Sequence, residues 1–186
     1  MTDKRELRRR LKARSASLTA EYRQASDAAI RGAVLDSELW QRAENVFLYV
    51  SMWKEPDTYT LLHAAFEASK RVYVPLCCPG GVMKAVRIHA LDGLRPGTLG
   101  IPEPVDCSET AAPGTLDLAI VPCTAASRDG RRIGHGAGYY DRFLREHGCR
   151  TLCLCYEELI TEEIPMDEND VWMDFVVTEK GTYRKQ

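Results

Sequence analysis

A glycine-rich segment flanked by arginines, residues 131–142, is the part of the sequence best suited to chemistry. Its glycines alternate at Gly134, Gly136 and Gly138. Without side chains there, a polyanion could approach the backbone, and the free amides that open a following helix attract phosphate. Arginines add forked donors that match phosphate oxygens, here from Arg128, Arg131 and Arg132. The segment therefore predicts phosphate binding, although a flexible, solvated loop has the same composition.

Asp141 lies near the end of this segment and offers a hard oxygen ligand for a metal ion. Mg²⁺ usually takes one or two carboxylates in a protein and completes its shell with water and nucleotide phosphates. A single aspartate is therefore chemically sufficient for a magnesium site beside bound phosphates.

A dinucleotide-binding fold is a second interpretation of the same glycines. Gly134 and Gly136 begin a G-x-G pattern, and Glu158 follows at a suitable interval. Tyr139, however, takes the place of the third glycine, and the preceding strand ends near Pro122, too far away for the required tight turn. A nicotinamide-dependent oxidoreductase is therefore the weaker hypothesis.

The N-terminal segment is basic although the formal net charge of the chain is only -2. Lys4 and Arg8 are four residues apart, so a helix would place both on one face. A solvated helix face, an anion-binding edge and a mitochondrial transit peptide all have such a composition, but Asp3 and Glu6 interrupt the transit-peptide pattern.

The composition indicates an ordinary globular protein. The chain has 186 residues, 45% hydrophobic and 28% charged, which suits one domain over residues 1–186. No apolar run approaches the ~20 residues of a membrane helix, and the start lacks a secretory h-region, so we expect a cytoplasmic protein. The seven cysteines contain no C-x-x-C pair, so zinc is not expected and Cys153 and Cys155 are interpreted as buried apolar residues.

Alternating strands and helices must position these groups. Apolar periodicity predicts helices at 3–16, at 20–35 after the cap Thr19, at 58–69 after the cap Thr58, and at 139–147. Strands are predicted at 46–50, 71–75, 82–91, 116–121, 151–155 and 175–178, the last being the final strand. Residues 92–113 are rich in Gly and Pro and should form surface loops. This order predicts an α/β fold, a layered single domain with a mostly parallel central sheet flanked by helices.

The glycine segment resembles that of the 5-formyltetrahydrofolate cyclo-ligase family, also called 5,10-methenyltetrahydrofolate synthetases. The matching residues are 117–122 (DLAIVP), Gly130, Arg132, Gly134, Gly136 and 138–141 (GYYD). Further matches occur in family order at Lys4, Leu7, Arg8, Leu11, Arg14, Ser51, Met52, Glu55, Thr58, 100–104 (GIPEP) and 168–170 (END). Departures are found at Cys123, Ala126, Ser127 and Glu158, where glycine, an aromatic residue, aspartate and glutamine are usual.

The resemblance implies a ligase that uses ATP and Mg²⁺ to cyclise 5-formyltetrahydrofolate to 5,10-methenyltetrahydrofolate, releasing ADP and phosphate. It implies catalytic roles for Glu55, Arg132 and Tyr140 and metal ligation by Asp141 and Asp170. The implied ATP contacts are Lys4, Arg5, Arg8, Arg132, Gly134, Gly136, Gly138, Tyr139 and Tyr140. The implied folate contacts are Val50, Met52, Glu55, His135, Gly136, Gly138 and Tyr139.

The implied reaction needs no protein nucleophile, because ATP phosphorylates the formyl oxygen and the substrate's own N10 then closes the ring. Positioning and charge stabilisation are sufficient. The departures leave a rival open, a non-catalytic folate- or nucleotide-binding regulator. We expect no nucleic acid or membrane partner, while the polyglutamate preference, the use of another N5-substituted folate and the oligomeric state stay open.

Overall fold

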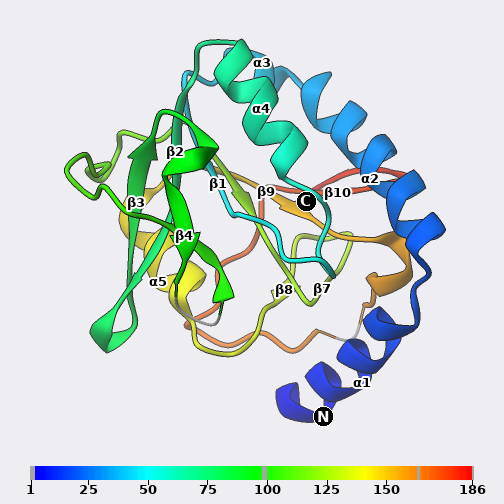
Figure 1. The fold of residues 1–186 in the computed structure, drawn as a ribbon. Helices are drawn as coiled ribbons and strands as arrows, with labels where there is room; N and C mark the ends of the chain where they lie inside the picture. Colours follow the sequence, from blue (N-terminus) through cyan, green and yellow to red (C-terminus); the bar gives the residue numbers. More distant parts are fainter. Residues whose placement is uncertain (1–2, 98–99, 163, 186) are drawn as a thin grey trace.

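Seven strands form the central sheet of the computed structural model, which describes residues 3–97, 100–162 and 164–185 (Figure 1). They are β1 (Asn45–Leu48), β2 (Arg71–Cys78), β3 (Val82–Ile88), β6 (Leu118–Val121), β9 (Arg150–Leu154), β10 (Phe175–Thr178) and β11 (Gly181–Arg184). Their order across the sheet is β11-β10-β9-β6-β1-β2-β3. The four inner pairings are parallel and the two edge pairings antiparallel, which confirms the prediction of a mostly parallel α/β sheet.

The inner strands are continuous apolar runs because both faces of the sheet are covered. Every residue of β6 is buried, for example. The helices are α1 (Lys4–Ser17), α2 (Ala20–Leu35), α3 (Glu38–Arg42), α4 (Tyr59–Glu67) and α5 (Tyr139–His147). Figure 1 shows α2 and α4 on one side of the sheet and α5 on the other. On the α5 side, the ring of Phe47 in β1 lies 4.6 Å from that of Phe143.

The structure confirms one of the two helix caps predicted from the sequence and differs from the prediction at the other. The Thr19 side chain accepts a hydrogen bond from the Tyr22 amide at 3.1 Å and starts α2, as predicted. Thr58 was predicted to cap α4, but its hydroxyl donates instead to the carbonyl of Tyr49 at 2.7 Å. The carboxylate of Asp57 accepts from the first amides of α4 and does the capping. Thr58 therefore fixes the loop after β1 rather than the helix.

Several short elements were not predicted. The five-residue α3 follows α2, and β11 pairs antiparallel with β10, so Phe175–Thr178 is not the last strand. The Gly/Pro-rich segment contains a two-stranded ribbon of β4 (Leu94–Pro96) and β5 (Pro102–Pro104). β7 (Ala125–Ala126) and β8 (Arg132–Ile133) have two residues each and pair with each other just before Gly134. No helix among the described residues is long and apolar enough to cross a membrane.

The connections leave the sheet in opposite directions at β1 and β6. From β1 the chain passes through α4 to β2 on one side, and from β6 it passes through α5 to β9 on the other. The two neighbours β1 and β6 therefore flank a topological switch point. In open α/β sheets, ligands bind outside the carboxyl ends of the strands at such a point.

Candidate active site

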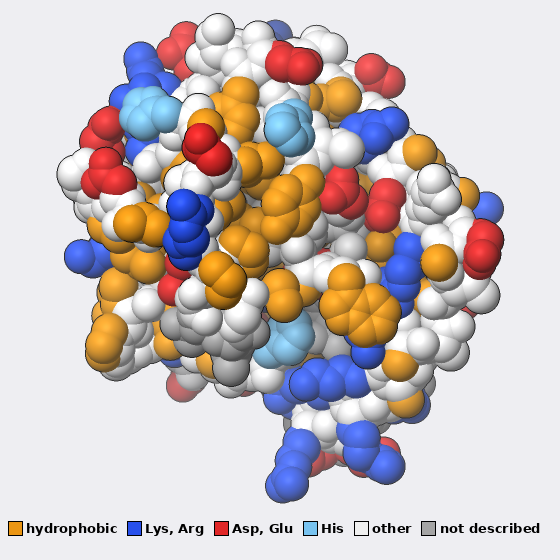
Figure 2. All heavy atoms as spheres, viewed as in Figure 1, with side chains coloured by type: hydrophobic (Ala, Val, Ile, Leu, Met, Phe, Trp, Pro, Cys, Tyr) orange, Lys and Arg blue, Asp and Glu red, His pale blue; other side chains and the backbone are white. Residues whose placement is uncertain are grey.

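A cleft with a volume of about 850 Å³ opens beyond the carboxyl ends of β1 and β6. The loop after β1 forms one wall with Glu55, and the glycine segment, which includes β8, forms another. The start of α1 closes one end with Lys4 and Arg8. In Figure 2, Lys and Arg side chains gather over α1 at the foot of the molecule, and hydrophobic side chains gather above them. The cleft thus combines a basic end with an apolar end.

The cleft brings together almost every residue predicted for the site. Its walls include Lys4, Arg8, Val50, Met52, Glu55, Arg132, Gly134, His135, Gly136, Gly138, Tyr139, Tyr140, Asp141 and Asp170. Arg5 is absent from these walls and lies exposed on α1. Lys4 and Arg8 share a helix face, whereas Arg5 is turned away from it by one residue, which explains the difference.

Arg132 is the arginine of the glycine segment that enters the cleft. It lies in β8 with its side chain 3% exposed, and its Nη2 donates to Oδ1 of Asp141 at 2.8 Å. Its buried Nε has no hydrogen-bond partner within the described part of the chain. A buried guanidinium with an unpaired N–H group is costly unless another acceptor can approach. This geometry suits a site for an anion.

Arg128 and Arg131 do not line the cleft, although the sequence analysis placed them with Arg132 at the phosphate. Arg128 pairs with Glu157, and Arg131 pairs with Asp129 at 2.8 Å. Their guanidinium groups therefore stabilise the outer side of the loop, and the expectation of phosphate contacts from them is not supported by their position.

The glycine segment is held in its conformation by arginines from two helices. Nε of Arg8 donates to the carbonyl of Gly134 at 2.8 Å, so α1 is fastened to the segment. Gly136 has φ 103°, and a Cβ atom there would lie 3.2 Å from Cζ of Arg8. Gly138 has φ 69° at the start of α5, where a Cβ would lie 2.8 Å from Nη1 of Arg142. Glycine is therefore favoured at both positions by the positive φ, whereas the ends of the arginine side chains could shift to make room for a Cβ atom.

The two predicted metal ligands are held next to basic side chains. Nζ of Lys4 lies 2.5 Å from carboxylate oxygens of both Asp167 and Asp170. Burial acts against the charged lysine, but these two hydrogen bonds dominate and raise the pKa of Lys4. Oδ1 of Asp141 accepts from Arg132 and from the amide of Val171 at 3.1 Å, which joins α5 to the segment that carries Asp170.

No group of three or more His, Cys, Asp or Glu side chains among the described residues could hold a metal ion by itself. Any Mg²⁺ at Asp141 and Asp170 would therefore need ligands from water and from a nucleotide. That coordination is the usual one for Mg²⁺ in nucleotide-dependent enzymes, so the donor set fits the ion.

Glu55 lies in the apolar part of the cleft. Its Oε2 accepts a hydrogen bond from the amide of Met52 at 2.8 Å, which curls the loop back on itself. Burial raises the pKa of Glu55 above its ordinary value. Burial, with the charge of Glu55 adding to it, also raises the pKa of Tyr140. Val50 is buried beneath the loop, so this end of the cleft suits a flat, largely apolar ligand with polar edges.

His135 lies on the rim of the glycine segment and is exposed. Desolvation at the cleft wall lowers its pKa, and the positive charges of Lys12 and Arg8 act in the same direction. The neutral imidazole is therefore favoured beside a basic helix. Such a group can donate or accept one hydrogen bond without adding charge.

Five charged side chains that line the cleft were not assigned to the site from the sequence, namely Lys54, Glu103, Arg142, Arg145 and Asp167. Arg145 is four residues after Asp141 on α5, a spacing that could have identified it. Arg142 joins the glycine segment to the β2–β3 connection, because its Nη2 donates to the carbonyls of both Ala137 and Gly81 at 2.8 Å. No sequence pattern indicates that long-range contact.

The residues at which this chain departs from the family pattern do not line the cleft, and they contribute to the structure around it. Ala126 and Ser127 are fully buried, and Oγ of Ser127 accepts from the amide of Arg131 at 3.1 Å, so serine holds the turn that leads to the segment. Cys123 is buried after β6, and Cys153 and Cys155 are buried along β9. All seven cysteines are free thiols. Glu158 is exposed and pairs with Arg14 at 2.8 Å.

Comparison with known proteins identifies the family. The model of the 5-formyltetrahydrofolate cyclo-ligase family matches residues 1–179. A "Probable 5-formyltetrahydrofolate cyclo-ligase" of Caenorhabditis elegans is 34% identical over 96% of this chain and 94% of its own. The 5-formyltetrahydrofolate cyclo-ligase of Mus musculus is 31% identical over 95% of this chain and 93% of its own.

Solved structures agree with this result. The NMR structure of Aquifex aeolicus 5,10-methenyltetrahydrofolate synthetase superposes with a TM-score of 0.85 at 29% identity, covering 98% of this chain and 93% of that one. The 5,10-methenyltetrahydrofolate synthetase of Mycoplasma pneumoniae has the same fold, with a TM-score of 0.77 at 18% identity, covering 96% of this chain and 99% of that one. The chain belongs to the 5-formyltetrahydrofolate cyclo-ligase family, as its sequence predicted, and is an enzyme of that ATP-dependent class.

Proposed function

We propose that the cleft holds 5-formyltetrahydrofolate against MgATP and converts the folate to 5,10-methenyltetrahydrofolate. The formyl oxygen attacks the γ-phosphorus, the bond to ADP breaks, and ADP leaves. N10 then attacks the activated formyl carbon and loses its proton, and the carbon–oxygen bond breaks to release phosphate. The observation that carries the proposal is the meeting of the Glu55 loop and the glycine segment in one cleft at the switch point.

The basic end of the cleft is the proposed nucleotide subsite. Lys4 and Arg8 project from α1, and the amides of the glycine segment and of the start of α5 supply neutral donors. Arg132 lies deepest and is the residue best placed to stabilise charge on the phosphoryl group during transfer. Arg5 stays a prediction for ATP contact, although its position on α1 does not support it.

Asp141 and Asp170 are the residues that would hold Mg²⁺. When bound, the ion would neutralise phosphate charge and orient the nucleotide for in-line transfer. The chain's own contribution is to hold Asp141 through the amide of Val171 and to hold Asp170 beside Lys4.

The apolar end of the cleft is the proposed folate subsite. The pterin has a flat ring with hydrogen-bond donors along one edge, which suits the carboxylate of Glu55 above Val50 and Met52. Tyr139 and Tyr140 also line the cleft, and their rings could pack against the pterin or the nucleotide base. A cytosolic location stays a prediction of the sequence, and the polyglutamate preference stays open.

The direct test incubates pure protein with 5-formyltetrahydrofolate and MgATP while methenyl absorbance and ADP are followed together. We expect one ADP for each methenyl product formed. Tight binding of both ligands without ADP would overturn the proposal and favour the regulator that the departures at Cys123, Ala126 and Ser127 suggest. ADP release without methenyl formation would point to a different acceptor.

A further inference from the structure

The loop that carries Glu55 makes backbone hydrogen bonds at four successive residues, each to a side chain outside the loop. Three backbone carbonyls accept hydrogen bonds: that of Lys54 from Arg23 at 2.6 Å, that of Glu55 from Tyr156 at 3.1 Å and that of Pro56 from Tyr49 at 2.7 Å. The backbone amide of Asp57 donates to the carboxylate of Asp27 at 3.2 Å. Tyr49 also lines the cleft, whereas Arg23, Asp27 and Tyr156 do not, so side chains outside the cleft help to set the position of the Glu55 carboxylate.

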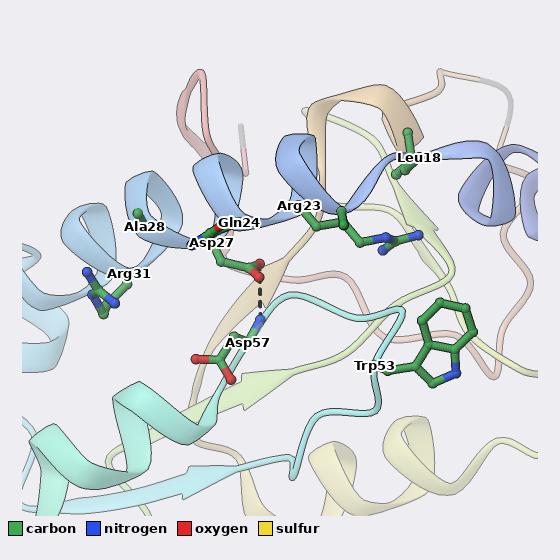
Figure 3. Close-up of a pocket in the computed structure, with 9 residues that line it drawn as sticks. Leu18, Arg23, Gln24, Asp27, Ala28, Arg31, Trp53 and Asp57 are labelled. Carbon is green, nitrogen blue, oxygen red and sulfur yellow. Dashed lines mark hydrogen bonds between the residues drawn. The ribbon is translucent and has the colours of Figure 1, made fainter.

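Two of these side chains come from one face of α2. Arg23 and Asp27 are one helical turn apart, and Figure 3 shows both directed from α2 toward the loop, with Asp27 bonded to the amide of Asp57. They lie on the wall of a second pocket, of about 570 Å³, which separates α2 from the loop. Trp53 is 77% exposed at the end of this loop and lines both pockets.

Arg23 differs from the other three side chains because it also binds α1. Its Nη2 donates to the carbonyl of Ser15, in the last turn of α1, while its Nη1 donates to Lys54. The guanidinium is 5.2 Å from the ring centre of Tyr156, and the residue is only 8% exposed. One buried side chain therefore ties the end of α1 to the loop after β1.

These two segments supply opposite ends of the cleft. α1 presents Lys4 and Arg8 to the proposed nucleotide subsite, and Arg8 is bonded to Gly134 of the glycine segment. The loop presents Glu55 to the proposed folate subsite. A shift of α1 on nucleotide binding would act on the Lys54 carbonyl through a rigid, planar guanidinium that is already bonded on both sides.

We infer that Arg23 is a positioning residue that couples the two substrates, so that nucleotide held by α1 favours the arrangement of the Glu55 loop that binds folate. The inference rests on the proposed function. A merely structural arginine would lower stability when replaced, whereas a coupling residue changes how strongly one ligand affects the other. Because such coupling is reciprocal, either ligand can be the one that is titrated.

The test measures the affinity for 5-formyltetrahydrofolate by calorimetry, with and without a non-hydrolysable ATP analogue and Mg²⁺. In the unmodified chain we expect the analogue to tighten folate binding about fivefold or more, the lower range of measured couplings. Arg23→Met should bring the ratio of the two folate affinities, with and without the analogue, to within about twofold of one. It should also raise KM for folate more than it lowers kcat. Arg31→Met changes another arginine of α2 on the same pocket and should leave the ratio unchanged.

Arg23→Lys keeps the charge but can no longer present a planar fork to both carbonyls, so its ratio should lie between those of the unmodified chain and Arg23→Met. This milder variant decides the question if Arg23→Met does not fold. A ratio of one in the unmodified chain, or an unchanged ratio in Arg23→Lys, would overturn the inference. A chain that binds both ligands with coupling but never forms product would overturn the proposed function alone.

Discussion

Nη2 of Arg132 lies 2.8 Å from Oδ1 of Asp141, so the side chain proposed for phosphate and the side chain proposed for metal neutralise each other. Lys4 and Asp170 form a second pair of this kind at 2.5 Å. MgATP carries both kinds of partner, since the ion attracts the carboxylates and the phosphates attract the cations. Each charge can therefore exchange one partner for another without being left unpaired, which an isolated buried charge could not do.

Replacing Arg132 by Ala should slow the reaction about 100-fold or more, mainly in kcat, because the lost donor acts on charge that develops during phosphoryl transfer. Steady-state kinetics of methenyl formation measure this effect. Arg128→Ala removes an arginine four residues before Arg132 that pairs with Glu157 outside the cleft, so it should leave kcat nearly unchanged. Near-normal kcat in a folded Arg132→Ala protein would refute the role.

Asp141→Asn and Asp170→Asn should each raise the Mg²⁺ concentration needed for half-maximal rate by about tenfold or more, the effect expected when a charged metal ligand is removed. Asp167→Asn is the matched control, because Asp167 also contacts Lys4 but is proposed to hold no metal. Titration of Mg²⁺ at saturating ATP distinguishes the three variants. An equal effect of Asp167→Asn would show that Asp167 also contributes to the metal site.

The thiols should react with alkylating agents in the order of their exposure. Cys107 is exposed, whereas Cys123, Cys153 and Cys155 are buried. A hydrogen bond with Cys123 and burial raise the pKa of Cys153, which further lowers its thiolate fraction. Mass spectrometry after a short iodoacetamide pulse should find Cys107 labelled and these three unlabelled, and Cys107→Ser should remove that label. Early labelling of Cys153 would show that β9 opens readily.

Long apolar patterns predicted most of the fold. β6 and α5 were predicted closely because a fully buried strand and a strongly amphipathic helix leave a clear periodicity. The two-residue strands β7 and β8 and the five-residue α3 carry too few residues for any period to appear. β11 was missed because its residues are exposed or half-buried, with no apolar face to indicate an edge strand.

The site was predicted in its residues but not in their arrangement. Arg131 and Arg132 are adjacent, and only the strand geometry of β8 decides that Arg132 alone points into the cleft. Likewise, the exclusion of Arg5 follows from helical spacing once the inward face of α1 is known from the buried Leu7 and Leu11. The support of Glu55 by Arg23 and Asp27 joins segments about thirty residues apart, which no local pattern reveals.

Glu55→Gln should stabilise the fold at neutral pH. Burial raises the pKa of Glu55, so the folded state binds a proton that the unfolded chain has released, and stability falls as pH rises from the ordinary glutamate pKa through the raised one. Glutamine does not titrate, so it removes this loss of folding stability, which is about 1.4 kcal/mol for each unit by which the pKa is raised. The Tm difference between the two proteins should therefore grow as pH rises above 4.5 and level off once pH exceeds the raised pKa. A difference independent of pH would contradict this explanation.

The same Glu55→Gln variant should weaken folate binding while leaving nucleotide binding nearly unchanged. The two subsites lie on different segments, and Glu55 makes its hydrogen bond to Met52 rather than to any residue of the basic end. Because glutamine can still accept from the Met52 amide, the loop should keep its shape, and the loss reports the missing charge at the pterin edge. Calorimetry should find about tenfold weaker folate binding, within the range for a lost charged hydrogen bond, and ring closure should slow.

Glu158→Gln is the matched control for this last variant. It makes the same change from carboxylate to amide at an exposed residue outside the cleft, where it also restores the residue usual in the family. Folate affinity and turnover should therefore be unchanged in Glu158→Gln. A Glu55→Gln protein that binds and turns over folate normally would remove Glu55 from the folate subsite. One whose chief defect is in ATP binding would reverse the assignment of the two ends of the cleft.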